Sequence, residues 1–371
     1  MKHMPLWDSG PPAEVSPLRH DLKADACVIG LGGSGLSCIH ELLSLGLTVA
    51  GIDAVGIAAG AAGRNGGFLL AGTAWFDHDA ARALGKTRAT AIYRQTLDEI
   101  NRMASLTPEA IRLTGSLRIA DDDAELADCD AHFDAMIDAG LPVERYRGPE
   151  GTGLLFPRDG VFNPAERCNA LANTAIARGA ALHAPARATR IERGAVTTER
   201  ATIHCGMVIV AVDGALSRVL PELAGTVRTA RLQMLSTAPA PEVSFPRPVY
   251  LRYGYEYWQQ LPDRRIALGG FRDRGGEAEW TDNSEPDVVV QDQLEHLLRT
   301  RLGVKAAITN RWAAAVSFRE AVLPFIGEVR PGVWAIGGYN GTGNVIGALC
   351  GRGVARMATN GDRSVLGALI D

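Results

Sequence analysis

Three glycines near the N-terminus have a spacing that lets a phosphate-bearing ligand approach the main chain. Gly30, Gly32 and Gly35 form a GxGxxG pattern where a short apolar run ends and a helical pattern begins. The first glycine permits a tight turn, the second allows backbone to approach a pyrophosphate, and the third allows close helix–strand packing. Free N–H groups at the helix N-terminus, here those near Gly33 and Ser34, favour the negative charge. The pattern predicts dinucleotide binding.

An acidic residue supports this prediction. Asp53 ends the second apolar run, 18 residues after Gly35, where a carboxylate can accept hydrogen bonds from ribose hydroxyls. An acid at this position disfavours a 2′-phosphate. The alternative is a glycine-rich turn between strand and helix that binds no ligand.

Two further glycine-rich segments bear on the size of the ligand. The first covers residues 60–68, GAAGRNGGF, and its main-chain N–H groups could face a large flat ligand, although a flexible surface loop has the same composition. The second, GGYNGTGN at residues 337–344, precedes another helix, whose N-terminus could stabilise negative charge on a reduced flavin. Helix capping by Thr342 or Asn344 is the simpler alternative. Two such segments favour FAD over NAD.

The elements that must position these residues are indicated by hydrophobic periodicity. Ala24–Ile29, a helix from near Gly33 and Thr48–Asp53 form a parallel βαβ unit. Further helices are predicted at residues 79–106, 121–139 and 164–178, from near 286 and from about 343. Strands are predicted at residues 180–184, 188–193, 201–205, 207–212, 231–236, 250–261, 265–270 and 333–336. The fold class is therefore α/β, with a second α+β domain on an antiparallel sheet.

The strand predicted at residues 250–261 is rich in aromatic residues and is the best candidate wall for a substrate. Strict alternation would place Tyr253, Tyr255 and Tyr257 on one face of the sheet. The other face would carry Tyr250, Arg252 and Trp258. A buried core role for these tyrosines is the alternative, because large aromatic residues dominate protein cores.

Composition excludes several classes of function. The 371 residues carry a net charge of −4, with no basic stripe for a nucleic acid. No apolar run suits a signal peptide or a membrane span, so a cytoplasmic protein is expected. Six cysteines are scattered without a CxxC pair, which argues against zinc. Asp77, His78 and Asp79 are interpreted as the start of a helix, and no metal is expected.

The motifs together resemble the D-amino-acid-oxidase-type FAD-dependent oxidoreductases, which include glycine oxidase and sarcosine oxidase. The greatest similarity is to γ-glutamylputrescine oxidase-like amine oxidases. The resemblance is carried by VIGLGGSGL, VAGIDAVGIAAGAAGRNGG, VIVAVDGALSRVLPEL, RWAAAVSFREAVLPFIG and WAIGGYNGTGN. These segments extend over nearly the whole chain. The GRNGG, LPFIG and GYNGTG pieces are more specific than the first glycine motif.

The resemblance implies a glutathione-reductase-type, Rossmann-like FAD-binding domain at residues 20–78, 150–226 and 320–371. It places a substrate domain at residues 79–149 and 227–319. The implied cofactor-binding residues are Gly30, Gly32, Gly33, Ser34, Gly35, Asp53, Ala54, Ala61, Gly63, Arg64, Asn65, Gly66, Gly67, Phe68, Ala188, Ala211, Gly338, Asn340, Gly341, Thr342, Gly343 and Asn344. The candidate catalytic residues are Tyr257, Arg64 and Asn340. Arg64 is either a carboxylate anchor or, as we favour, a donor that fixes its loop.

Three departures from the family pattern affect the prediction. The stretch AAAVSFRE holds neither the Cys nor the His to which some members attach FAD, so noncovalent FAD is expected. Val316 stands where glycine oxidase-like members have an arginine for the substrate carboxylate, and Arg319 lies nearby. Ala267 stands where sarcosine oxidase-like members have a lysine that activates oxygen, so oxygen or another acceptor remains open.

The predicted function is oxidation of the C–N bond of a small amine or amino acid by hydride transfer to FAD. The flavin supplies the chemistry, while the protein positions the substrate and provides the electrostatic field around it, so no acid–base pair is nominated. Two alternatives remain: an FAD-dependent hydroxy-acid dehydrogenase on the same fold, and a non-catalytic flavin-binding module. The sequence predicts no oligomeric state.

Overall fold

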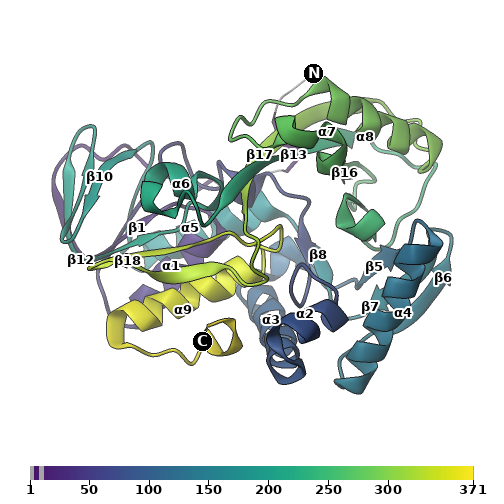
Figure 1. Ribbon diagram of the computed structural model, residues 1–371. Helices are drawn as coiled ribbons and strands as arrows, with labels where there is room; N and C mark the ends of the chain where they lie inside the picture. The colour runs from purple at the N-terminus through teal and green to yellow at the C-terminus, as the bar shows by residue number, and fades with distance from the viewer. Residues whose placement is uncertain (1–3, 8–11, 371) are drawn as a thin grey trace. The chain divides into compact units, whose positions relative to one another are not determined.

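The computed structural model describes residues 4–7 and 12–370, and these form two compact units (Figure 1). Unit 1 contains residues 4–6, Arg64–Phe162 and Thr229–Ala315. Unit 2 contains the described residues of Trp7–Gly63, Asn163–Arg228 and Val316–Asp371. The chain therefore leaves unit 2 and returns to it twice.

The elements are numbered as in Figure 1. The helices are α1 (Gly33–Ser44), α2 (Asp77–Leu84), α3 (Lys86–Leu106), α4 (Asp123–Asp138), α5 (Pro164–Ala177), α6 (Leu216–Val219), α7 (Arg272–Gly275), α8 (Val288–Thr300) and α9 (Ile346–Asn360). The strands are β1 (Leu22–Ile29), β2 (Val49–Ile52), β3 (Phe68–Leu69), β4 (Ile111–Arg112), β5 (Ser116–Ile119), β6 (Glu144–Gly148), β7 (Gly151–Phe156), β8 (Gly160–Phe162), β9 (Ala181–His183), β10 (Ala188–Glu192), β11 (Ala195–Thr198), β12 (Thr202–Val210), β13 (Arg228–Thr237), β14 (Val249–Leu251), β15 (Glu256–Gln260), β16 (Ile266–Gly270), β17 (Ile308–Phe318), β18 (Phe325–Arg330) and β19 (Val333–Gly337).

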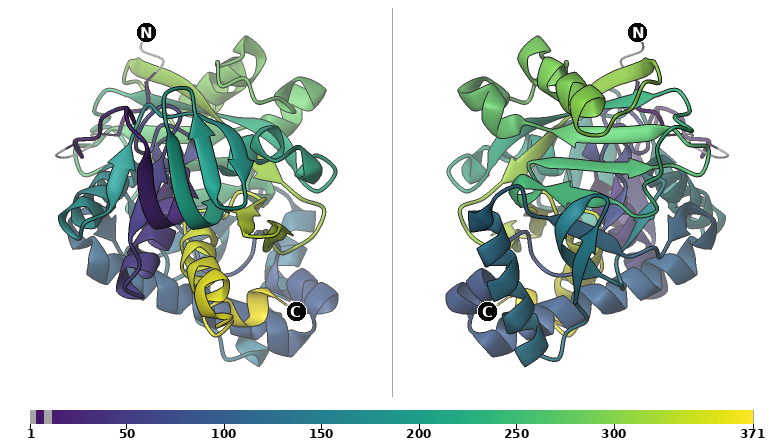
Figure 2. Two further views of the ribbon diagram at one scale, coloured as in Figure 1. Left: turned by 90° about the vertical axis from the view of Figure 1, so that its left-hand side faces the viewer. Right: turned by 90° about the vertical axis from the view of Figure 1, so that its right-hand side faces the viewer.

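Unit 2 is built on a sheet with the strand order β10–β11–β12–β1–β2–β9, and β19 also pairs with β12. β1 runs parallel to β2 and β12, which confirms the predicted βαβ unit. Helix α1 packs against α5 and α9, and Figure 2 shows α9 in yellow beneath the strands. No side chain at Gly351 of α9 would fit, because its Cβ would overlap with the Ser34 carbonyl oxygen. The two helices are therefore in backbone contact.

Unit 1 contains a sheet with the order β17–β13–β16–β15–β14–β5–β7–β6 and a small sheet β3–β8–β4. One face of the large sheet packs on α8, shown in light green in Figure 2, through a core that includes Leu117, Trp258, Leu268 and Leu294. Since successive residues of a strand point to opposite faces, the neighbours of these core residues lie on the other face. That face concerns the candidate site.

The helix predicted at residues 79–106 is two helices. Gly85 has a φ of +84°, which separates α2 from α3. Because glycine populates positive φ without steric cost, the chain can bend there despite a continuous hydrophobic pattern. The strands predicted at residues 201–205 and 207–212 are in turn one strand, β12, and β11 was not predicted.

The aromatic strand predicted at residues 250–261 is also interrupted. Arg252 and Tyr253 have φ values of +49° and +56°, and the chain turns back there to form the β14–β15 hairpin. The predicted alternation was wrong as a result. Tyr250 pairs with Tyr257 on the same face, while Tyr253 is 44% exposed in the turn.

The two units do not follow the predicted domain boundaries throughout. Residues 64–78 and 150–162, predicted for the FAD-binding domain, lie in unit 1. These residues supply β3, β7 and β8, which pair with other strands of unit 1. The assignment of FAD binding to unit 2 and of substrate binding to unit 1 stays a prediction. Asp371, the last residue of the predicted FAD-binding range, lies outside the described residues.

Candidate functional site

The turn between β1 and α1 requires glycine at two of the three motif positions. A Cβ on Gly35 would overlap with the Gly30 carbonyl oxygen. A Cβ on Gly30, whose φ is +109°, would overlap with the carbonyl oxygen of Ala211. The Ala211 N–H in turn donates to Ile29 at 2.8 Å, so the end of β12 lies against this turn. Close packing of backbone on backbone thus explains both glycines.

The N-terminus of α1 has no side-chain cap and no acidic residue in its first turn. Gly32 is the N-cap residue, and a Cβ there would lie 3.0 Å from Ala62 Cβ, in the loop that follows β2. The N–H of Ala58 ties the same loop to the Leu31 carbonyl at 3.1 Å. An uncapped helix end favours an anion through its N–H groups and its dipole, so this turn fits a pyrophosphate.

Asp53 holds this turn together. Its Oδ2 accepts from the Leu31 N–H at 3.1 Å, and its Oδ1 accepts from the N–H groups of Val55 and Gly56 at 2.9 and 3.1 Å. An ionised carboxylate offers about four acceptor positions, so roughly one remains for a ribose hydroxyl. The sequence analysis did not foresee this structural role. The ribose contact stays a prediction.

The loop Gly338–Asn344 in unit 2 is fixed by two polar side chains. Asp213 accepts from the Gly338 N–H at 2.9 Å and from the Ser317 N–H at 3.1 Å, and its burial raises its pKa to about 6. Asn340, at a φ of +53°, accepts from the Arg319 N–H at 2.7 Å and donates to the Ala321 carbonyl at 2.9 Å. The Asn340 amide therefore positions the loop.

Helix α9, which follows this loop, has no side-chain cap. The Thr342 hydroxyl donates instead to the Tyr339 carbonyl at 2.8 Å. Capping of α9 by Thr342, the simpler alternative for this glycine-rich segment, is therefore not what the structure shows. The first two N–H groups of α9, those of Ile346 and Gly347, donate to the carbonyls of Thr342 and Gly343 at 3.3 and 3.0 Å.

The segment Arg64–Phe68 belongs to unit 1 and is fixed there from both ends. Arg64 Nη1 donates to the Ala313 carbonyl at 3.2 Å, while Trp312 Nε1 donates to the Arg64 carbonyl at 2.8 Å. Gln259 Nε2 donates to the carbonyls of Gly66 and Gly67. Arg64 thus donates to the main chain of β17, and its role towards a ligand stays a prediction.

A row of side chains crosses the face of the unit 1 sheet that points away from α8. Arg118 on β5 is paired with Tyr250 on β14, and Tyr250 with Tyr257 on β15. Tyr257 is paired with Gly269 on β16, where a Cβ would lie 2.5 Å from the Tyr257 ring. Phe68 contacts both tyrosines edge-on, with ring centroids 5.0 and 5.8 Å away. The row joins the Arg64–Phe68 segment to the centre of the sheet.

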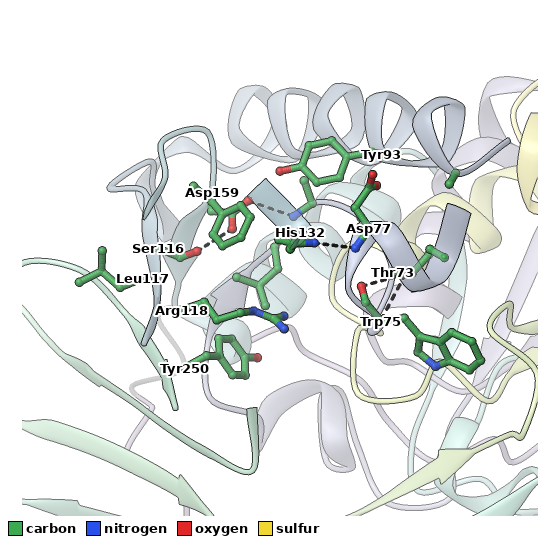
Figure 3. Close-up of a pocket in the computed structure, with 16 residues that line it drawn as sticks. Thr73, Trp75, Asp77, Tyr93, Ser116, Leu117, Arg118, His132, Asp159 and Tyr250 are labelled. Carbon is green, nitrogen blue, oxygen red and sulfur yellow. Dashed lines mark hydrogen bonds between the residues drawn. The ribbon is translucent and has the colours of Figure 1, made fainter. Parts of the chain in front are cut away.

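A pocket that is open to solvent lies in unit 1 at the Arg118 end of this row (Figure 3). Its walls come from the chain after β3, from α2, α3 and α4, and from β5, β7 and β14. The lining residues are Leu70, Ala71, Gly72, Thr73, Trp75, Asp77, Ala80, Ala89, Tyr93, Ser116, Leu117, Arg118, His132, Phe156, Asp159 and Tyr250. Such a mixture of aromatic walls with a few polar groups is typical of small-molecule sites.

Burial shifts the pKa values of two polar residues that line the pocket, Asp159 and His132. Asp159 accepts from Ser116 Oγ at 2.6 Å and from the Ala71 N–H at 3.0 Å, yet burial raises its pKa to about 7. His132 accepts from the Asp77 N–H through Nδ1 at 2.6 Å, and burial lowers its pKa well below the usual value. A neutral His132 therefore fixes the first turn of α2 at the pocket.

The sequence analysis predicted Tyr257 but missed Arg118 and the pocket. The signal for Arg118 is weak, because one charged residue in the four-residue strand SLRI resembles an ordinary exposed position. The pocket is assembled from segments far apart in the chain, and no local pattern predicts it.

Two further observations bear on the kind of protein. Within residues 4–7 and 12–370, no three His, Cys, Asp or Glu side chains gather as a metal site requires. In the same residues, no helix combines the length and apolar character needed to cross a membrane. All six cysteines are buried and none forms a disulfide, as expected of small apolar core residues.

Comparison with known proteins identifies the family of this chain. The sequence matches the family described as FAD dependent oxidoreductase over residues 25–357. The chain belongs to this family. As an FAD-dependent oxidoreductase, it requires a site for the ADP half of FAD, and the uncapped α1 terminus beside Asp53 fits that group.

Individual relatives are distant. The FAD-dependent oxidoreductase is 27% identical to the probable oxidoreductase OrdL of Rhizobium meliloti (strain 1021), over 91% of this chain and 83% of the relative. It is 24% identical to the gamma-glutamylputrescine oxidoreductase of Escherichia coli (strain K12), over 93% of this chain and 86% of that one. Its fold is similar to that of glycine oxidase from Geobacillus kaustophilus, with a TM-score of 0.75, 19% identity and coverage of 92% and 96%.

Proposed function

We propose that this flavoenzyme oxidises the C–N bond of a small amine or amino acid to an imine. Membership of the FAD-dependent oxidoreductases supports the redox chemistry. The names of two similar proteins, a gamma-glutamylputrescine oxidoreductase and a glycine oxidase, support a nitrogen-containing substrate. The structural observation that carries the proposal is the aromatic row of unit 1, which leads into a pocket lined by aromatic and polar side chains.

The proposed roles follow the predicted residues. Gly30, Gly32 and the α1 N-terminus would hold the pyrophosphate, and Asp53 a ribose. The backbone near Ala188, at the start of β10, would contact adenine. The segments Arg64–Phe68 and Gly338–Asn344 would lie along the flavin. The contacts of Arg64 and Asn340 described above make both positioning residues in this proposal.

The flavin supplies a hydride acceptor, and the residues of this chain supply position and exclude water. The amine must be neutral when its C–H bond gives up the hydride, and the N–H proton is then lost to solvent. Tyr257 is the proposed substrate-facing residue, with its ring held over Gly269 and against Phe68. Burial raises the pKa of Tyr257, so its hydroxyl stays protonated and can donate a hydrogen bond.

The electron acceptor is proposed to be oxygen or another acceptor. Ala267, on the same sheet face as Gly269, is paired with Gln259 and offers no amine at the position where sarcosine oxidase-like members have their lysine. FAD is proposed to be noncovalent. Retention of the yellow colour in an acid-precipitated pellet would contradict that part.

An anaerobic screen tests the function. Purified protein with bound FAD is mixed with primary amines, secondary amines, amino acids and hydroxy acids, and the flavin absorbance near 450 nm is followed. We expect bleaching with at least one amine or amino acid and with no hydroxy acid. Bleaching by hydroxy acids alone would favour a hydroxy-acid dehydrogenase, and an unchanged spectrum throughout would favour a non-catalytic flavin-binding protein. Either result would overturn the proposal.

A further inference from the structure

The guanidinium of Arg118 has an unusual environment for a charged group that lines a pocket. Its central carbon lies 4.4 Å from the centroid of the Phe76 ring. Across the described part of the chain, Arg118 makes no hydrogen bond and no ion pair within 4 Å. Figure 3 shows its side chain among the pocket residues, pointing towards the space between Tyr250 and Thr73. The Arg118 guanidinium thus lacks a carboxylate at ion-pair distance among the described residues.

Two acids, Glu125 and Asp159, interact with Arg118 electrostatically, but neither forms an ion pair with it. The Glu125 carboxylate accepts hydrogen bonds from the N–H groups of Asp121 and Tyr253 instead. Both oxygens of the Asp159 carboxyl already accept hydrogen bonds, from Ser116 and from Ala71. Burial raises the Asp159 pKa to about 7, so Asp159 is protonated in a large fraction of the molecules near neutral pH. Burial also lowers the pKa of Arg118. Because a partly buried charge without a partner is costly, an anion from a ligand would be favoured here.

The register of the sheet fixes where such an anion would lie. Arg118 is one strand from Tyr250 and two strands from Tyr257. Neighbouring strands are about 4.8 Å apart, so the backbone positions of Arg118 and Tyr257 are about 10 Å apart. A ligand that reaches both residues must be elongated.

We propose that Arg118 binds an anionic group, a carboxylate, of the amine substrate. The planar guanidinium offers a fork of donors that matches a carboxylate bidentately. Given the distance along the row, the carboxylate is separated from the reacting C–N bond by a chain of several atoms. The inference rests on the proposed amine oxidation for its substrate, but anion binding at Arg118 can be tested without turnover.

Three variants distinguish an effect of the Arg118 charge on ligand binding from an effect on folding. Arg118→Met removes the charge and keeps an unbranched chain over the Phe76 ring, and it leaves no protein partner unpaired. Arg118→Lys keeps the charge and loses the fork. Arg147→Met, at an exposed position of β6 in the same sheet, controls for the loss of one positive charge. Flavin content and melting temperature show whether each variant is folded.

Binding is measured by calorimetric titration of the FAD-loaded full chain with hexanoate, and with hexan-1-ol as the uncharged match. We expect hexanoate to bind more tightly than hexan-1-ol. Arg118→Met should weaken hexanoate binding by about 10- to 100-fold, the range for a charge-assisted hydrogen bond, and leave hexan-1-ol unchanged. Arg118→Lys should fall between the two, and Arg147→Met should behave as the wild type. Equal hexanoate affinity in the wild type and Arg118→Met would overturn the inference.

Reduction kinetics then separate this inference from the proposed function. We compare 6-aminohexanoate with hexylamine under anaerobic conditions and expect the wild type to favour the carboxylate. Arg118→Met should remove that preference by raising the half-saturating concentration of 6-aminohexanoate. If amines bleach the flavin but the preference survives in Arg118→Met, the function stands and the inference fails. If hexanoate binding depends on Arg118 but no amine in the full screen bleaches the flavin, the anion site stands and the proposed function fails.

Discussion

Tyr250 and Tyr257 lie opposite each other on the two strands of the β14–β15 hairpin, with ring centroids 5.8 Å apart. The Phe68 ring contacts both of them edge-on. One cluster therefore links the Arg64–Phe68 segment to the Arg118 pocket within unit 1. Substitutions in this cluster can separate packing from chemistry.

We predict that Tyr257→Phe lowers the rate of flavin reduction by about 10-fold, a typical size for one lost hydrogen bond, without changing the melting temperature by more than about 2 °C. The ring that packs on Phe68 is kept and only the hydroxyl is lost. Stopped-flow reduction with a substrate from the screen measures the rate. Flavin content and the melting temperature control for the loss of a buried hydroxyl. An unchanged rate in Tyr257→Phe would make Tyr257 a core residue only.

A second prediction concerns FAD binding. Gly32→Val should give folded protein with less than about a tenth of the wild-type flavin, because the branched side chain would occupy the approach of a pyrophosphate to the α1 N-terminus. The ratio of absorbance at 450 and 280 nm measures flavin content. Gly225→Val is the control, since no atom lies within 4 Å of a Cβ there. A fully loaded, yellow Gly32→Val protein would refute the predicted ADP site.

The third prediction is a pH dependence of stability. Burial raises the Asp159 pKa from 3.8 to about 7, so between these values the folded state binds more protons than the unfolded state. The contribution of Asp159 to the free energy of unfolding is therefore largest below about pH 4. It decreases by at most about 4 kcal/mol as the pH rises to about 7.

Urea unfolding at pH 5.0 and 7.5 tests this dependence. Asp159→Asn keeps an acceptor for the Ala71 N–H and should reduce the loss of stability between the two pH values. Asp213, whose pKa burial also raises, contributes in the same direction, so the difference between wild type and variant is the quantity that matters. If the free energy of unfolding falls equally between pH 5.0 and 7.5 in the wild type and in Asp159→Asn, Asp159 is not the source of the pH dependence.

The fourth prediction concerns an ion pair in unit 1. Arg231 donates through Nε and Nη2 to both oxygens of Glu279, and their side chains are 8% and 1% exposed. Glu279→Gln leaves the buried guanidinium with only the more distant Asp287, 4.0 Å away, and should destabilise the protein by about 2–4 kcal/mol. Asp130→Asn, which breaks the half-exposed pair with Arg145, should cost less than about 1 kcal/mol. Urea unfolding compares them, and similar losses would contradict the expected effect of burial.

Secondary structure was predicted best from the sequence where the local backbone conformation and the packing between elements require the same residues. The strand, turn, helix and strand over residues 22–52 were found because the glycines that permit the turn also permit close packing. The prediction failed where a single backbone angle decides the outcome. Positive φ at Gly85, Arg252 and Tyr253 splits a helix and a strand whose hydrophobic patterns look continuous. Arginine and tyrosine give no warning of such a turn.

The candidate site was predicted only in part, for a related reason. Tyr257 was predicted from the aromatic strand and from the family position that it matches, whereas no sequence pattern singles out Arg118, whose candidate role depends on its environment. Its neighbour Tyr250 and the Phe76 ring are far from it in sequence. The lack of an ion pair at Arg118 is a property of three-dimensional packing, which the spacing of residues along the chain does not reveal.

The contact between α1 and α9 has a consequence for biosynthesis. The carboxylate of Glu41 in α1 accepts from Arg352 and Arg356 in α9, and Gly351 admits the backbone of Ser34. A growing chain on the ribosome therefore presents the first nucleotide-binding turn long before its partner helix has been translated. Until the last segment emerges, the side of α1 that packs against α9 has no cover, and we expect this side to be accessible to chaperones and proteases during that interval.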